Sequence, residues 1–170
     1  VWLSDNGEGF RIADEDGMLD ESEQQLLIML CAIRRGASRL ILPMGVTSAA
    51  RELAQRYGVR LEYVESERAE WMKQLCAGEK EQFLLQFDGI YGALRLMELA
   101  LENGGSLRGL LHGLPELHRK QRTVSVDWRD KGKVLRTLSE SYPQAELGDG
   151  IRLNTDKGWV WVRPSGERAE

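Results

Sequence analysis

The sequence is poor in cysteine, histidine, surplus positive charge and long apolar runs, and each shortage excludes a class of protein. Only two cysteines occur among 170 residues, and both Cys31 and Cys76 lie in apolar helical stretches. We expect buried free thiols rather than a disulfide or a nucleophile, and hence a reducing, cytoplasmic location. The two histidines, His112 and His118, have no cysteine or histidine neighbour at ligand spacing, which argues against a metal centre built on them.

Charge and hydropathy exclude two kinds of partner. The formal net charge is -4, whereas a phosphate-binding face for nucleic acid needs clustered surplus Lys and Arg. No apolar run approaches the ~20 residues that cross a bilayer, and we expect no signal peptide. We therefore expect neither nucleic acid nor a membrane as a partner. Glycine-rich nucleotide loops and the Gly-x-Ser-x-Gly nucleophile turn are also missing from the sequence.

Apolar periodicity predicts an α/β fold for the first part of the chain. Two strands, joined by a turn at Asn6-Gly7, are followed by helices and strands that alternate every ten to fifteen residues. This order predicts one compact domain over residues 1–115, with a layered, mixed but largely parallel sheet flanked by helices. The expected strands are 1–3, 10–13, 39–45, 59–64 and 82–87, and the expected helices are 20–35, 48–57, one from Ser66, 88–102 and one from Ser106.

The pattern changes after a polar, proline-marked linker at residues 114–121. A strand at 122–128, a helix at 130–141 and two paired strands at 150–155 and 158–163 predict a small α+β (β-α-β-β) subdomain over residues 120–170. About fifty residues is small for independent stability. Because the sequence begins inside a predicted strand without Met, we expect it to be an excised piece of a longer protein.

The stretch "LSDNGEGFRIADEDG", residues 3–17, has the acids and glycines of a metal loop. In an extended loop alternate side chains point the same way, and here these are Ser4, Asn6 and Glu8. They offer a hydroxyl, an amide oxygen and one carboxylate, whereas Mg²⁺ usually takes two or three carboxylates. A hairpin turn with polar side chains is the favoured interpretation, with a bound metal as the alternative.

Two further segments carry candidate ligand-binding residues. "RPSG" follows a predicted strand, where Arg163 can hold a phosphate bidentately, Ser165 can donate a hydroxyl and Gly166 can expose its amide. Glu79, in a polar loop predicted at residues 77–82, can accept hydrogen bonds from sugar hydroxyls. Taken alone, a simple turn and a solvated loop are the favoured interpretations of the two segments.

Taken together, four segments resemble one family. "ADEDG", "GE", "FDGIYGALRLMELA" and "WVRPSG" fall in the order and at the spacings of the C-terminal half of the α-D-phosphohexomutases, which include phosphoglucomutase and phosphomannomutase. The resemblance implies the family's third domain at residues 1–115 and a truncated fourth domain at 120–170. The substrate-binding residues that it implies are Glu79, Arg163, Ser165 and Gly166.

The same resemblance places the family's three metal-binding aspartates at Ser4, Asn6 and Glu8. Two of the three carboxylates are absent, so the resemblance implies a degenerate loop that has lost the Mg²⁺ used in phosphoryl transfer. No cofactor is expected, and Mg²⁺ only if this loop still functions. The family's nucleophilic phosphoserine belongs to a first domain outside this sequence.

Three hypotheses about function follow. The favoured one is a degenerate module of a larger carbohydrate-metabolism protein that binds or senses hexose phosphate without catalysing, with the preceding domains of the same polypeptide as its partner. "VSVDWRDKGKVLRTL" and "SDNGEG" resemble regions fused to nucleotidyltransferases of the mannose-1-phosphate guanylyltransferase type. The alternatives are part of an active hexose-phosphate mutase with an atypical metal loop, and a structural or interaction domain without a ligand.

Overall fold

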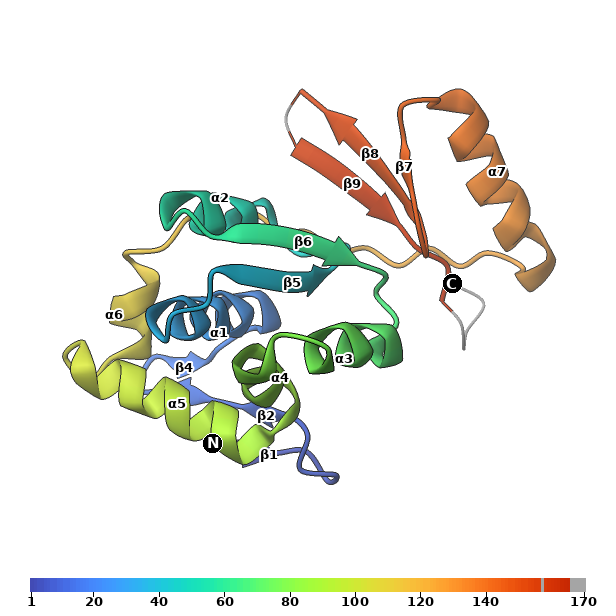
Figure 1. The fold of residues 1–170 in the computed structure, drawn as a ribbon. Coiled ribbons are helices and arrows are strands. Elements are labelled where there is room, and N and C mark those ends of the chain that lie inside the picture. The colour runs from blue at the N-terminus through green and yellow to red at the C-terminus, as the bar shows by residue number, and fades with distance from the viewer. Residues whose placement is uncertain (157, 166–170) are drawn as a thin grey trace.

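The structure, a computed structural model, describes residues 1–156 and 158–165 and combines helices with short strands (Figure 1). The predicted α/β class is confirmed. The first eighteen residues form two antiparallel hairpins, of which the first has its predicted turn at Asn6-Gly7 and Gly7 at a φ of 71°. Their strands are β1 (Trp2–Leu3) with β2 (Phe10–Arg11) and β3 (Ala13–Asp14) with β4 (Gly17–Met18).

Helix α1 (Glu21–Arg34) begins and ends where the sequence predicts. The Asp20 carboxylate accepts the amide hydrogens of Ser22 and Glu23, and the Glu23 carboxylate accepts that of Asp20, which completes a capping box. The middle of the helix is buried in the main core, against β5 and α5. Cys31 is 3% exposed there, as predicted, but Cys76 is exposed, so the prediction of two buried thiols is wrong for Cys76.

The parallel part of the fold consists of β5 (Arg39–Pro43) and β6 (Arg60–Val64), connected by α2 (Ser48–Arg56). Apolar side chains of β5 are buried on both faces, as predicted for a central strand. The predicted strand at residues 82–87 is wrong, because α4 (Lys80–Phe87) occupies it. Parallel pairing among the described residues is therefore limited to β5 and β6, a smaller sheet than the sequence predicts.

Side chains take over the hydrogen bonds that a third strand would make with β5. The Gln82 amide, 2% exposed, donates to the Ile41 carbonyl oxygen at 2.7 Å and accepts the Ile41 N–H at 3.0 Å. Trp71, in α3 (Arg68–Cys76), donates Nε1–H to the same carbonyl oxygen at 2.8 Å. Because these bonds satisfy the backbone of Ile41, helices can cover this edge of the strand.

Two helices complete the first part, α5 (Gly89–Glu102) and α6 (Leu107–Leu111). Both begin at predicted caps, since the Asp88 carboxylate accepts the Tyr91 N–H and the Ser106 hydroxyl oxygen accepts the Gly109 N–H. In Figure 1, α5 lies on the far side of α1 and α4 from β5 and β6, next to the β1–β2 hairpin.

The last part contains a three-stranded antiparallel sheet in the order β7-β8-β9. The predicted helix and two paired strands are confirmed, but residues 122–127 form no strand, and Val124 is 69% exposed without a neighbouring strand. The elements are a 3₁₀ turn at Trp128–Asp130, α7 (Lys131–Ser141), β7 (Glu146–Leu147), β8 (Ile151–Thr155) and β9 (Gly158–Val162). The division at residues 115–120 stays a prediction.

None of the helices in the described part of the chain has the length and apolar character needed to span a membrane.

Candidate functional site

The loop between β1 and β2 is closed by hydrogen bonds among its own residues. The Gly9 N–H donates to Ser4 Oγ at 2.8 Å, and the Ser4 hydroxyl donates to Asn6 Oδ1 at 2.7 Å. The backbone adds bonds from Ser4 N–H to the Gly9 carbonyl at 2.9 Å and from Gly7 N–H to the Ser4 carbonyl at 2.9 Å. Two of the three metal positions that the resemblance implies are thus bonded to each other.

The third position, Glu8, forms an ion pair outside the loop. Its Oε2 lies 2.6 Å from Nη2 of Arg68, the first residue of α3, and the Arg68 guanidinium lies 4.7 Å from the centre of the Phe87 ring. Within residues 1–156 and 158–165, no three side chains of His, Cys, Asp or Glu converge as ligands of a metal ion would. One paired carboxylate, one hydroxyl and one amide do not fit the ligand set that Mg²⁺ prefers.

Asp14, the first acid of "ADEDG", has structural partners. The Asp14 carboxylate accepts the Asp16 N–H at 3.1 Å and the Arg108 N–H at 3.1 Å. The Arg108 side chain also pairs with Glu23 of the α1 capping box. Asp14 and Glu23 therefore hold α6 and the start of α1 against the second hairpin.

The start of α5 packs directly on the same loop, a contact that the sequence reading missed. The Gly89 N–H donates to the Gly7 carbonyl oxygen at 2.8 Å. A Cβ atom at position 89 would lie 2.5 Å from the Gly9 carbonyl oxygen and 2.8 Å from that of Gly7. The glycine that follows the Asp88 cap was the available signal, since glycine permits such close backbone approach.

Glu79 lies at the amino end of β5, where it forms an ion pair with a strand residue. Arg39, the first residue of β5, donates Nε–H to Glu79 Oε1 at 2.9 Å and lies 3.5 Å from Glu62. The hydrogen bond to Glu79 raises the pKa of Arg39 above its ordinary value. The predicted loop at residues 77–82 is shorter than expected, because α4 begins at Lys80. Glu79 is therefore a partner of β5 in this structure.

The phosphate-loop candidates follow β9. The Arg163 guanidinium lies 5.2 Å from the centre of the Trp161 ring, and the Ser165 carbonyl oxygen accepts a hydrogen bond from Lys131 Nζ at 2.6 Å. Gly166, the last of the predicted substrate-binding residues, lies outside the described residues. Arg163 and Ser165 are thus held by the last sheet and α7.

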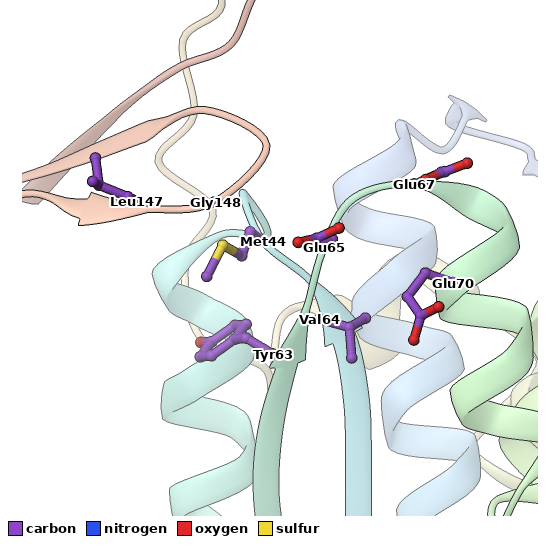
Figure 2. Close-up of a pocket in the computed structure, with 8 residues that line it drawn as sticks. All are labelled: Met44, Tyr63, Val64, Glu65, Glu67, Glu70, Leu147 and Gly148. Carbon is purple, nitrogen blue, oxygen red and sulfur yellow. The ribbon is translucent and has the colours of Figure 1, made fainter. Parts of the chain in front are cut away.

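A cleft of about 450 Å³ separates this last sheet from the carboxyl ends of β5 and β6 (Figure 2). Met44 and Tyr63 line it from the strand ends, and Leu147, the last residue of β7, and Gly148 line it from the other side. Arg163 lies beside Gly150, two residues after Gly148, because a Cβ atom on Gly150 would lie 3.2 Å from the Cα of Arg163. Ligands of α/β proteins commonly bind at the carboxyl ends of the strands.

The rest of the cleft lining consists of Val64 and three acidic side chains around the start of α3, Glu65, Glu67 and Glu70. Hydrogen bonds from Gln74 and Lys73 hold the pKa of Glu70 below its ordinary value. Glu67 is followed by Arg68, the partner of Glu8, so the β1–β2 loop and the cleft meet at the first turn of α3. The structure thus brings the β1–β2 loop and the cleft near each other, and it leaves Glu79 at the far end of β5.

Comparison with known proteins finds similarity to phosphoglucosamine mutases, and no family model matches the chain. A probable phosphoglucosamine mutase of Methanopyrus kandleri is 36% identical over 83 residues, 46% of this chain and 18% of the relative. One from Methanococcoides burtonii is 38% identical over 82 residues, also 46% of this chain. The phosphoglucosamine mutase of Methanococcus maripaludis aligns with 98% of this chain at 22% identity.

The chain spans less than half the length of these relatives, 42% of the Methanococcus maripaludis protein and 18% of the Methanopyrus kandleri one. What the comparisons support is a module similar to part of a phosphohexomutase.

Proposed function

We propose that the chain is a degenerate phosphohexomutase-like module of a larger carbohydrate-metabolism protein, and that it binds or senses a sugar phosphate without transferring its phosphoryl group. The observation that carries this proposal is that the side chains at the three implied metal positions of the β1–β2 loop are already bonded to other groups of the protein. Ser4 and Asn6 are hydrogen-bonded to each other, and Glu8 is paired with Arg68. The similarity to phosphoglucosamine mutases supports the sugar phosphate as ligand class.

Phosphoryl transfer sets demands that this loop does not meet. Charge on the transferring group is stabilised by Mg²⁺ and by positively charged side chains. To recruit Mg²⁺, the loop would have to break the bond between Ser4 and Asn6 and release Glu8 from Arg68. The single carboxylate of Glu8 would then have to offset most of the free-energy cost of removing water from the ion. The loop therefore serves as a structural support for α5 and α3.

Binding of the ligand falls to the cleft and to the segment after β9. Arg163, with its guanidinium beside the Trp161 ring, offers a planar fork of donors that matches a phosphate. The cleft carboxylates accept hydrogen bonds from sugar hydroxyls, and they suit the ammonium group of an amino sugar. Glu79 takes no part in this arrangement, because it lies beside Arg39.

The test is calorimetric titration of the 170-residue chain with glucosamine 6-phosphate and mannose 1-phosphate, with and without MgCl₂. We expect binding that does not depend on Mg²⁺ and that weakens roughly 10-fold or more in Arg163→Gln, since a charge-assisted hydrogen bond contributes about 1.5–3 kcal/mol. Arg122→Gln, at an exposed position in the segment before the 3₁₀ turn, is the matched control and should bind normally. Absence of binding by either sugar phosphate contradicts the proposal and favours a structural domain without a ligand.

A second candidate is part of an active mutase, favoured by the names of the relatives. It requires micromolar Mg²⁺ binding and phosphoryl transfer by the full-length protein. We also propose that a sugar-phosphate nucleotidyltransferase precedes this module in the parent protein. The complete coding sequence of the parent protein tests this. A phosphoserine-loop domain in that position would instead favour the active mutase.

A further inference from the structure

Arg152, in β8, is a buried cation without a hydrogen-bonded partner. The residue is only 8% exposed, and its buried Nε–H has no acceptor among the described residues. The carboxylate of Glu146 lies 3.9 Å from Nη1, which is longer than a hydrogen bond. Buried charges are normally both paired and hydrogen-bonded, because removing a charge from water is costly. Arg152 therefore lacks the partner that its position requires.

Glu146 is a weak substitute for that partner. Its side chain is half exposed, and its Oε1 accepts a hydrogen bond from Asn154 Nδ2 at 3.1 Å. An ion pair with a carboxylate that stays in water contributes little. The side chain can also rotate into solvent without losing any hydrogen bond to Arg152. Glu146 therefore leaves the charge of Arg152 available to another anion.

Aromatic rings hold the Arg152 guanidinium beside the cleft. Its central carbon lies 4.7 Å from the centre of the Trp159 ring and 6.0 Å from that of the Tyr63 ring. Tyr63, near the carboxyl end of β6, belongs to the cleft lining. A guanidinium that packs against rings with its faces keeps its N–H groups directed outwards in its own plane. Those N–H groups are the donors that the described residues leave without an acceptor.

A second arginine approaches the same tyrosine. Arg51, in α2, has its guanidinium carbon 5.7 Å from the centre of the Tyr63 ring. It is exposed, and in the described part of the chain it forms no ion pair and no hydrogen bond. The guanidinium carbons of Arg51 and Arg152 are thus at most about 12 Å apart. Like charges repel each other, and an anion bound between them would replace this repulsion with two attractions.

The two arginines lie away from the acidic part of the cleft. Figure 2 shows Tyr63 on the α2 side, whereas Glu67 and Glu70 lie towards α3. The cleft therefore has a positive side and a negative side. A ligand with a negatively charged group at one end and hydroxyl or ammonium groups at the other matches this distribution.

We propose that Arg51 and Arg152 bind a phosphate group at the Tyr63 side of the cleft. Arg152, fixed between two rings, presents a planar fork of donors that suits a phosphate. Arg51 is free to rotate towards the bound anion, and Glu146 turns away from it. Neither arginine lies in the segments from which ligand binding was predicted, and the proposal does not depend on Arg163. The phosphate is either inorganic phosphate or the phosphoryl group of an organic phosphate, since both present the same oxygens.

Titration of the 170-residue chain with inorganic phosphate at constant ionic strength tests the site. Nuclear magnetic resonance of the arginine Nε–H groups should show saturable shifts for Arg51 and Arg152. Arg51→Gln should weaken phosphate binding roughly 10-fold or more, because a charge-assisted hydrogen bond is lost. Arg60→Gln removes the same charge from a side chain that is 76% exposed at the first residue of β6, and it should bind normally.

Two further variants separate ligand binding from a structural role. Glu146→Gln removes the carboxylate that competes for Arg152, so it should strengthen phosphate binding, whereas a purely structural ion pair predicts no gain. Arg152→Lys keeps the charge but loses the planar fork, so it should weaken binding. Circular dichroism checks that the Arg152 variant is folded. Arg51 is exposed, so Arg51→Gln tests the site even if the Arg152 variant does not fold.

The same titrations with glucosamine 6-phosphate identify the source of the phosphate. If Arg51→Gln weakens both ligands, the site takes the phosphoryl group of the sugar phosphate; if it weakens inorganic phosphate alone, the site takes the free ion. Binding of inorganic phosphate without binding of any sugar phosphate contradicts the proposed function and leaves this site intact. The site is overturned if inorganic phosphate does not bind saturably, if Arg51→Gln and Arg60→Gln weaken binding equally, or if Glu146→Gln fails to strengthen it.

Discussion

The amide of Gly89 donates a 2.8 Å hydrogen bond to the carbonyl oxygen of Gly7, which fixes the start of α5 on the loop between β1 and β2. A side chain at position 89 has no room, because its Cβ would lie 2.5 Å from the Gly9 carbonyl oxygen. The loop that the resemblance marks as a former metal site thus positions a helix, and the two segments depend on each other for their conformation.

Gly89→Ala should therefore destabilise the protein by about 1–3 kcal/mol, the usual effect of overpacking a close contact. Urea denaturation followed by circular dichroism measures the change. Gly132→Ala is the matched control, since Gly132 lies in α7 with no atom within 4 Å of its Cβ position. That variant should be neutral or up to about 1 kcal/mol more stable, because alanine favours helix. Equal effects of the two substitutions would contradict the packing argument.

Gln82→Leu should cost about 1–3 kcal/mol, because it leaves the buried Ile41 N–H without an acceptor. The Ile41 carbonyl oxygen keeps its bond from Trp71, so the loss is limited to one backbone group. Gln74→Leu, on the exposed face of α3, removes a hydrogen bond to Glu70 and should change stability by less than about 0.5 kcal/mol. Thermal unfolding of both variants checks the difference; a Gln82 variant as stable as the wild type refutes it.

The same residue explains how far the fold could be predicted. "QFLLQF" has the short apolar pattern of a buried strand, and periodicity cannot separate such a run from one buried face of a helix. The deciding interaction joins Gln82 to Ile41, 41 residues away, and local patterns do not report it. The elements with caps in the sequence, such as α1 after Asp20, were predicted correctly because their signals are local.

For the candidate site, the sequence located the segments but not their partners. Glu8 pairs with Arg68 over 60 residues and Glu79 with Arg39 over 40 residues. These ion pairs decide which carboxylates are accessible to a ligand. Neither is visible in the spacing of motifs, because each depends on how α3 and β5 pack. The cleft glutamates were missed for the same reason.

Burial raises the pKa of the Cys31 thiol from 9.0 to about 11. Between these values the unfolded chain loses its thiol proton while the folded chain keeps it, so stability falls as pH rises. We expect the wild type to lose about 1–2 kcal/mol more than Cys31→Ala between pH 8 and pH 11, a value reduced for screening by solvent. Urea denaturation at a series of pH values measures this, and parallel curves for the two proteins would contradict it.

Two of the four predicted substrate-binding residues, Glu79 and Arg163, lead to opposite expectations. Glu79→Gln should leave the affinity for glucosamine 6-phosphate unchanged and lower stability by no more than about 1 kcal/mol, because it weakens only the partly exposed pair with Arg39. Arg163→Gln should weaken the affinity. Calorimetry on both variants decides the matter, and loss of affinity in Glu79→Gln would show that Glu79 contacts the ligand.

Restoring carboxylates to the loop should restore a metal site. In the triple variant Ser4→Asp, Asn6→Asp and Glu8→Asp, three alternate carboxylates replace the bonded Ser4 and Asn6 and the paired Glu8. Hard carboxylate oxygens converging from one extended loop are the ligands that Mg²⁺ prefers. We expect MgCl₂ to raise the melting temperature of the triple variant and to leave that of the wild type unchanged.

The control for this gain adds the same two negative charges elsewhere, in Ser141→Asp with Gln144→Asp, at exposed positions at the end of α7 and beyond. It separates a specific site from a general electrostatic effect, which would stabilise both variants alike. Mg²⁺ stabilisation of the wild type equal to that of the triple variant would show that Ser4, Asn6 and Glu8 already bind the ion. The loop would then be a working metal site with unusual ligands, and the active-mutase hypothesis would gain its missing component.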